Sequence, residues 1–197
     1  MTPREHGGHT LPELPVIAGS VDDATALAPL WSLEETARAV LVATGPDPMA
    51  VDLALDDLDA PAGRVLLPDA CPGGPAEELS RLLPRFDAML GDGAAPGAPG
   101  VAAVVVRGGS TAALAATQVA VWRGVPVLAL DAPVRTRVEA ANRAAVVGLC
   151  AWQSSEAGAA SYPARLDLLV HRRLDDARRR RVVCMSVTPG AAPGLSA

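Results

Sequence analysis

Five consecutive residues, Arg107-Gly108-Gly109-Ser110-Thr111, have the composition of an anion-binding turn. The glycines let the backbone approach a ligand closely, and Ser110 or Thr111 can cap a helix whose free N–H groups attract negative charge. The run lacks the lysine and the spacing of a P-loop, and it does not match the G-x-G-x-x-G pattern of dinucleotide-binding domains. Two interpretations stay open: a ligand-binding turn, or a tight turn with a good helix cap.

A second polar group follows downstream, at Asp131, Arg135, Glu139, Asn142 and Arg143. Carboxylates beside guanidinium groups are what proton transfer at a sugar phosphate requires, provided that these side chains line one cleft. The simpler alternative concerns Glu139 and Arg143, which are four positions apart on a predicted helix and could pair on its surface.

The elements that would position these residues follow from an alternation of short apolar runs with helical stretches. We predict strands at 14–18, 39–44, 64–67, 101–106, 125–130 and 147–152, with a last one at 181–187. We predict helices at 48–58, 75–90, 111–123, 135–147 and 157–177, and a first helix capped by Ser20 with apolar positions from Ala24 to Leu33.

Strands that alternate with longer helices indicate repeated βαβ units. We therefore predict an α/β fold: a Rossmann-like, doubly wound parallel sheet of five to seven strands in a single domain. The run at 101–106 is apolar on both faces, as a central strand should be. We expect a flexible leader at 1–13, the domain at 14–190 and a tail at 191–197.

In such sheets ligands bind at the carboxyl ends of the strands. The turn at 107–111 follows one predicted strand and Asp131 follows the next, so both polar groups should meet at one edge of the sheet.

Composition narrows the function classes. The chain has 197 residues, a formal net charge of −5 and 3% aromatic residues, which disfavours a nucleic-acid binder. No apolar run reaches the length of a membrane helix or a signal peptide, so we expect a cytoplasmic protein without membrane contact.

The histidines and cysteines show no spacing typical of a metal site or a disulfide framework. They are His6, His9, His171, Cys71, Cys150 and Cys184. We expect no metal and no cofactor.

The segment 101–143 resembles the N-terminal half of the non-hydrolysing UDP-N-acetylglucosamine 2-epimerases, whose fold is GT-B-like. That family has a strand, a His-Gly-Asp-Thr-Thr turn, a long helix, a strand ending in His-Val-Glu-Ala-Gly-Leu-Arg-Thr, and then Glu-Glu-x-Asn-Arg. Here the order is VVVRGGST, AALAATQVAVWRG, VPVLALDAPVRT and VEAANR. With AGSVDDATALAPL near the start and RVVCMSVTPG near the end, the resemblance covers about 14–190.

Several catalytic positions of the family are altered in this chain. The catalytic Asp of the turn falls on Gly109, and the His before it falls on Arg107. An Arg of the first loop falls on Val21, although Asp23 stands where a Glu would be. The Glu of the second motif becomes Asp131, which is shorter by one methylene.

Other positions are kept, namely Arg135, Glu139, Asn142 and Arg143. The resemblance therefore implies Asp131, Glu139 and Arg143 as the catalytic candidates. It implies ligand-binding roles for Asp23, Arg135 and Asn142 and for the turn Arg107, Gly108, Gly109, Ser110 and Thr111.

In the family, a second domain holds the nucleotide, and we expect this chain to lack that domain. Our first hypothesis is a degenerate epimerase-like domain that binds a UDP-sugar or related small anion, or a protein partner. The alternative is an active sugar-nucleotide epimerase that works as an oligomer or with a separate second half. A third reading is another activity on this scaffold, such as half of a glycosyltransferase. An uncovered docking face would favour self-association or a hetero-partner, and we predict a dimer.

Overall fold

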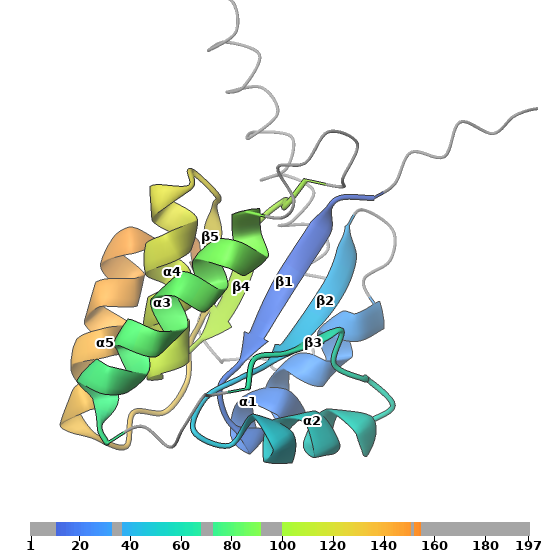
Figure 1. Ribbon diagram of the computed structural model, residues 1–197, viewed down its shortest axis with the longest axis horizontal. Helices are drawn as coiled ribbons and strands as arrows, with labels where there is room; N and C mark the ends of the chain where they lie inside the picture. Colours follow the sequence, from blue (N-terminus) through green and yellow to red (C-terminus); the bar gives the residue numbers. More distant parts are fainter. Residues whose placement is uncertain (1–10, 33–36, 68–72, 92–99, 151, 155–197) are drawn as a thin grey trace, which may run out of the picture.

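Six parallel strands form one sheet in the computed structural model, which describes residues 11–32, 37–67, 73–91, 100–150 and 152–154 (Figure 1). The sheet order is β3-β2-β1-β4-β5-β6. The strands are β1 (Glu13–Ala18), β2 (Arg38–Ala43), β3 (Arg64–Val65), β4 (Val104–Arg107), β5 (Val127–Leu130) and β6 (Trp152–Ser154). This confirms the predicted Rossmann-like, doubly wound sheet in a single domain, with β1 and β4 at its centre.

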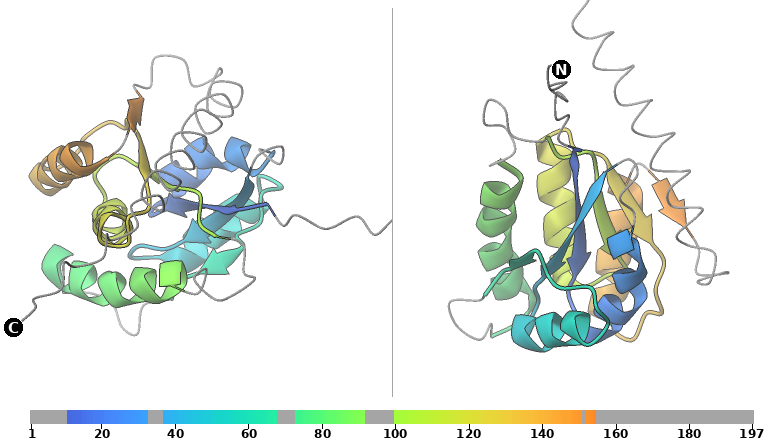
Figure 2. Two further views of the ribbon diagram at one scale, coloured as in Figure 1. Left: turned by 90° about the horizontal axis from the view of Figure 1, so that it is seen from above. Right: turned by 90° about the vertical axis from the view of Figure 1, so that its right-hand side faces the viewer.

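Helices cover both faces of the sheet (Figures 1 and 2). The helices are α1 (Val21–Leu27), the 3-10 helix η1 (Ala28–Ser32), α2 (Pro48–Asp56), α3 (Pro75–Gly91), α4 (Thr111–Trp122) and α5 (Arg137–Leu149). The helices α1, η1 and α2 pack on one face, whereas α3, α4 and α5 pack on the other. The chain reverses its direction across the sheet between β3 and β4, which is where doubly wound folds place their ligand crevice.

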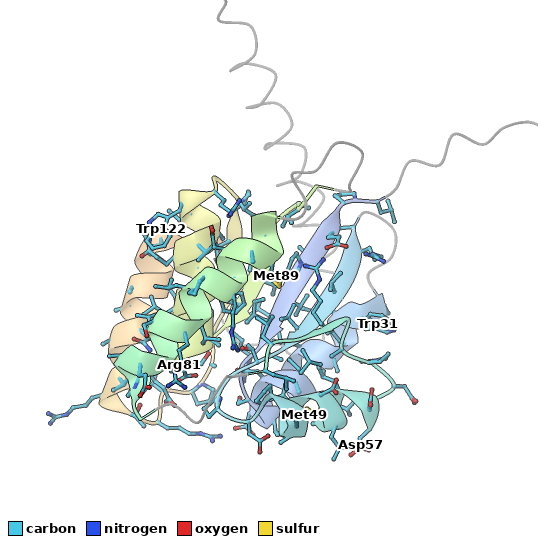
Figure 3. The ribbon with its side chains drawn as sticks, viewed as in Figure 1. Trp31, Met49, Asp57, Arg81, Met89 and Trp122 are labelled. Carbon is cyan, nitrogen blue, oxygen red and sulfur yellow. The ribbon has the colours of Figure 1, made fainter. Side chains whose placement is uncertain are left out.

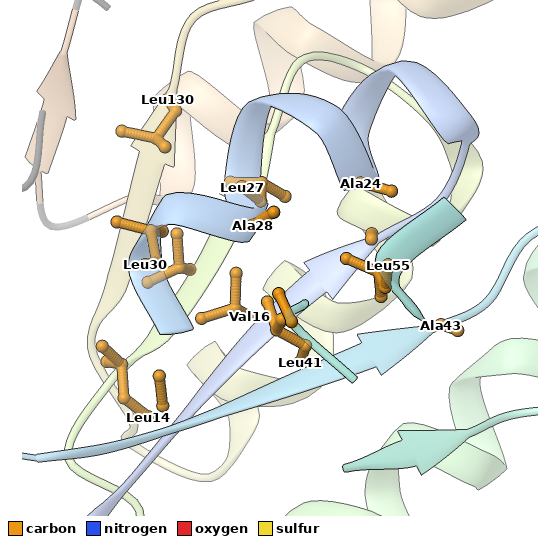
Figure 4. Close-up of a cluster of buried hydrophobic side chains, with 14 of the residues drawn as sticks. Leu14, Val16, Ala24, Leu27, Ala28, Leu30, Leu41, Ala43, Leu55 and Leu130 are labelled. Carbon is orange, nitrogen blue, oxygen red and sulfur yellow. The ribbon is translucent and has the colours of Figure 1, made fainter. Parts of the chain in front are cut away.

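The side chains of each strand alternate between the two helical layers. Val16 and Leu41 enter the core beneath α1 and α2, while their neighbours Ile17 and Val42 enter the core beneath α3 and α4. Figure 4 shows the first core, where Leu27 and Leu30 lie near Leu130. The strands read as continuous apolar runs because both of their faces are buried.

The outer surfaces of the helices carry some apolar side chains besides the polar ones (Figure 3). Met89 of α3 is 6% exposed and faces the core, whereas Met49 of α2 and Trp122 of α4 are 58% and 65% exposed. Apolar side chains therefore remain on the surface of two helices.

Four helices have polar caps at their first turns. Ser20, Asp47, Ser110 and Thr136 each accept a hydrogen bond from a backbone N–H three residues later. The cap predicted at Ser20 is confirmed, at 3.2 Å from the Asp23 nitrogen. These caps fix where each helix begins, and therefore which residues face the carboxyl edge of the sheet.

Several predicted boundaries were wrong. The first helix does not continue through its apolar positions: α1 ends at Leu27, η1 follows, and Trp31 is 36% exposed. The strand predicted at 101–106 is confined to Val104–Arg107, and Val101 only bridges to Glu13. Strand β1 begins at Glu13, within the predicted leader. The elements predicted at 157–177 and 181–187 and the rest of that leader, 1–10, lie outside the described residues.

In the described part of the chain, no helix is long and apolar enough to cross a membrane.

Candidate functional site

A cleft of about 1060 Å³ opens at the carboxyl edge of the sheet. Its walls come from the turns after β1, β4 and β5 and from the start of α3. The structure brings together most of the predicted site residues here: Asp23, Arg107, Gly108, Gly109, Ser110, Thr111, Arg135, Glu139 and Asn142. Asp131 and Arg143 are absent from the lining.

The turn between β4 and α4 forms the floor of the cleft. Ser110 caps α4, and its hydroxyl accepts a hydrogen bond from the Ala113 nitrogen at 3.1 Å. Gly108 has a φ of +67°, which favours glycine, and its nitrogen donates to the Leu130 carbonyl at 2.9 Å. The structure therefore confirms a capped tight turn, which also lines the cleft; the binding of a ligand by this turn stays a prediction.

Gly109 lies directly against the backbone of α5. A Cβ atom at this position would lie 2.0 Å from the Glu139 carbonyl oxygen and 2.8 Å from the Arg143 nitrogen. Cβ atoms do not approach backbone atoms this closely, so α5 would have to move to admit a side chain. The close packing of α4 and α5 at the cleft therefore requires glycine at position 109.

A buried ion pair joins α1 to the end of β4. Arg107 Nη1 donates to Asp23 Oδ1 at 3.0 Å, and the Gly19 nitrogen donates to Asp23 Oδ2 at 3.3 Å. The two side chains are 13% and 8% exposed. Burial raises the pKa of the Asp23 carboxyl above its ordinary value, and the hydrogen bond from Arg107 only partly opposes this rise. Two predicted ligand-binding residues thus bind each other.

A second, exposed ion pair joins Asp22 of α1 to Arg135 in the β5–α5 turn. Both residues line the cleft, so the pair connects two of its walls. Asp22 is not among the residues predicted from the sequence, and its one signal there is its place beside Asp23 in the first turn of a helix.

Glu139 closes a capping box at the start of α5. Its Oε2 accepts hydrogen bonds from the Arg135 nitrogen at 2.6 Å and the Thr136 nitrogen at 3.1 Å, and its own nitrogen donates to Thr136 Oγ1 at 3.1 Å. The surface pair considered between Glu139 and Arg143 is not what the structure shows. Arg143 instead pairs with Asp131 at 2.5 Å, outside the lining of the cleft.

Glu78, in the first turn of α3, lines the cleft and was not predicted from the sequence. Burial raises the pKa of its carboxyl, and a side-chain hydrogen bond with Thr111 partly offsets the rise. The available signal was topological, because α3 leads into β4 and so begins at the same sheet edge as the other cleft residues.

Carboxylates outnumber guanidinium groups around the cleft. The acidic lining residues are Asp22, Asp23, Glu78 and Glu139, and the basic lining residues are Arg107 and Arg135. An anion here would depend on the N–H groups at the start of α4. Among the described residues, no group of three or more His, Cys, Asp or Glu side chains could hold a metal ion.

No protein-family model matches the sequence, and no curated protein matches it either. Solved structures do resemble the fold. UDP-GlcNAc 2-epimerase from Neisseria meningitidis, bound to UDP-GlcNAc, superposes with a TM-score of 0.63 and 20% identity over 73% of this chain and 40% of that chain. The Methanocaldococcus jannaschii enzyme, in complex with UDP-GlcNAc and UDP, gives 0.60 and 19% over 78% and 43%.

A third match, the S. aureus MnaA–UDP structure, gives a TM-score of 0.63 and 19% identity over 79% of this chain and 42% of that one. The chain therefore spans about two fifths of the length of these structures, at their N-terminal end. At these identities the likeness establishes the fold, in agreement with the fold that the sequence resemblance implied.

Proposed function

We propose that this protein is an epimerase-like binding domain that holds a UDP-sugar, or a related small anion, in its cleft without epimerising it. The cleft lies at the crevice where doubly wound sheets bind ligands, and its volume of about 1060 Å³ is ample for such a molecule. The similar solved structures from N. meningitidis and M. jannaschii contain UDP-GlcNAc.

The observation that carries the non-catalytic part is the contact of Gly109 with α5. The sequence resemblance places an acid–base carboxylate at this position, yet a Cβ there would lie 2.0 Å from a backbone oxygen. The catalytic candidates that remain are engaged elsewhere: Asp131 pairs with Arg143, and Glu139 holds two backbone N–H groups. General acid–base catalysis needs a group that is free to reach the substrate proton. These carboxylates are instead held by the ion pair and the backbone hydrogen bonds just described.

The proposal includes a partner molecule that covers apolar surface at the cleft. Val21 and Val138 line the cleft and are 46% and 44% exposed, so apolar surface remains at its walls. We propose that a second copy of the chain covers this surface, and a hetero-partner is the other candidate. Sedimentation at micromolar concentration tests the dimer, and a monomeric mass contradicts it.

A second candidate function is an active epimerase completed by another chain. The observation in its favour is that Arg135, Glu139 and Asn142 line the same cleft. In this case the partner would supply the groups that this chain does not.

A proton NMR experiment in heavy water with UDP-GlcNAc separates these functions. Broadening of the ligand signals without loss of the C2 proton signal is the expected result. If the C2 proton signal disappears with the wild type but persists in a parallel E139Q sample, the active enzyme is established instead. Sharp, unchanged ligand signals would overturn both and leave the partner-protein function.

A further inference from the structure

Glu78 enters the cleft from α3, next to the first residue of α4. It is half-buried and lines the cleft together with Thr111. Thr111 is itself buried. Burial raises the pKa of the Glu78 carboxyl, and the neighbouring Thr111 side chain partly offsets this rise. The carboxylate therefore lies in the cleft beside a polar side chain that has little freedom to move.

The other carboxylates lining the described part of the cleft already have strong partners. Asp22 and Asp23 each pair with an arginine, and Glu139 accepts from two backbone N–H groups. Within that lining, Glu78 is the carboxylate held by neither an arginine nor a backbone N–H. An ionised carboxylate has about four acceptor sites, so Glu78 retains acceptor capacity.

The charges around the cleft determine which chemical groups of a ligand can bind beside Glu78. Carboxylates outnumber arginines around the cleft, and both lining arginines, Arg107 and Arg135, already face aspartates. A diphosphate beside Glu78 would be repelled by an uncompensated negative charge. An uncharged group rich in hydroxyls or amide N–H groups would instead supply the donors that a half-buried carboxylate lacks.

We propose that Glu78 is a specificity-determining residue of the cleft, where it accepts hydrogen bonds from the glycosyl portion of the ligand and not from a nucleotide phosphate. This rests on the proposed function, because it assumes that the cleft takes a sugar nucleotide. Thr111 is the positioning residue, since its buried side chain lies beside the Glu78 carboxylate.

The test is a calorimetric titration of UDP-GlcNAc and of UDP into the full chain and its variants. E78Q keeps the size of the side chain and removes its charge. The matched control is E77Q, because Glu77 is adjacent in the same helix turn, pairs with Arg81 and does not line the cleft. We expect E78Q to weaken UDP-GlcNAc binding about tenfold while UDP binding and E77Q stay at wild-type values.

T111V adds a second readout. It should weaken UDP-GlcNAc in the same direction as E78Q but less, and the double variant should bind no more weakly than E78Q alone.

The contrary outcomes are distinct. If the wild type and E78Q bind UDP-GlcNAc equally well, the proposed role of Glu78 is overturned and the proposed function stands. Tighter binding of both ligands by E78Q would place Glu78 beside the phosphates and overturn the role as well. A wild type that binds neither ligand would overturn the proposed function and this inference together.

Discussion

Gly109 and the Glu139 carbonyl oxygen are in contact across two elements, so close that a Cβ at position 109 would lie 2.0 Å from that oxygen. The contact sets the distance between the turn that begins α4 and the first turns of α5. Because Glu139 and Arg143 supply the nearest backbone atoms, any side chain at position 109 would have to displace this part of α5.

The first prediction concerns this contact. We expect G109A to lower the free energy of unfolding by about 1–3 kcal/mol, because the added methyl forces α5 away from the turn. Urea unfolding followed by circular dichroism measures the change. The control is G148A, which lies within α5 with no atom within 4 Å of its new Cβ and should be neutral or stabilising by up to about 1 kcal/mol. Equal stabilities of G109A and wild type would show that α5 is not held against the turn.

The second prediction separates a structural from a catalytic role for Glu139. If Glu139 serves the capping box, E139Q keeps an acceptor oxygen and should retain wild-type stability and UDP-GlcNAc binding. E139A should lose about 0.5–2 kcal/mol of unfolding free energy through loss of the cap. Thermal unfolding and ligand titration together check this. A fully stable E139Q that has lost ligand binding would give Glu139 a direct contact with the ligand.

The third prediction follows from the raised pKa of Asp23. Because the folded state holds the proton more tightly than the unfolded state, Asp23 contributes most to stability at low pH. This contribution falls as pH rises from the ordinary value of 3.8 through the raised pKa of the folded state. The free energy of unfolding of the wild type relative to D23N should therefore decrease across this interval.

Unfolding of wild type and D23N at matched pH values checks the sign. D23N retains an oxygen that can accept from Arg107, but it places an amide NH2 where Oδ2 accepts from the Gly19 nitrogen. The lost bond shifts the stability of D23N by the same amount at every pH, so the change of the difference with pH reports the charge. A difference that stays constant or grows as pH rises would mean that the attraction of Arg107 matches or exceeds the cost of burying the carboxylate.

The fourth prediction uses a buried hydroxyl. Thr117 of α4 is 0% exposed, and its Oγ1 has no hydrogen-bond partner in the described structure. Replacing it with valine, which has a similar shape, should raise the free energy of unfolding by about 1 kcal/mol. T25V is the comparison, because the exposed Thr25 hydroxyl donates to the Val21 carbonyl at 3.0 Å. A destabilised T117V would reveal a partner for the hydroxyl, such as a bound water.

The sequence predicted the sheet well because its strands are buried on both faces. Runs such as 39–43 and 125–130 are apolar without interruption, and the cap at Ser20 marks a helix start, so local chemistry is enough to identify them. The break of the first helix into α1 and η1 was missed, because the apolar spacing continues through Trp31 while the packing does not.

Most of the candidate residues meet at the predicted edge of the sheet, but their ion pairs were not predicted. The order of strands and turns brings Arg107 and Arg135 to one edge, and periodicity cannot reveal that each meets an aspartate from α1. Spacing within α5 favoured Glu139 with Arg143, whereas the ion pair that forms uses Asp131 of the preceding turn. Such pairings depend on distances between elements, which no local pattern encodes.

The fit of Gly109 against α5 also limits which residues position 109 can accept. Every other residue type begins with a Cβ atom, and that atom would lie 2.0 Å from the Glu139 carbonyl oxygen, so small and large side chains meet the same obstacle. A substitution at this position is therefore tolerated only together with a change that moves α5. Position 109 and the packing of α5 are expected to vary together, and not independently.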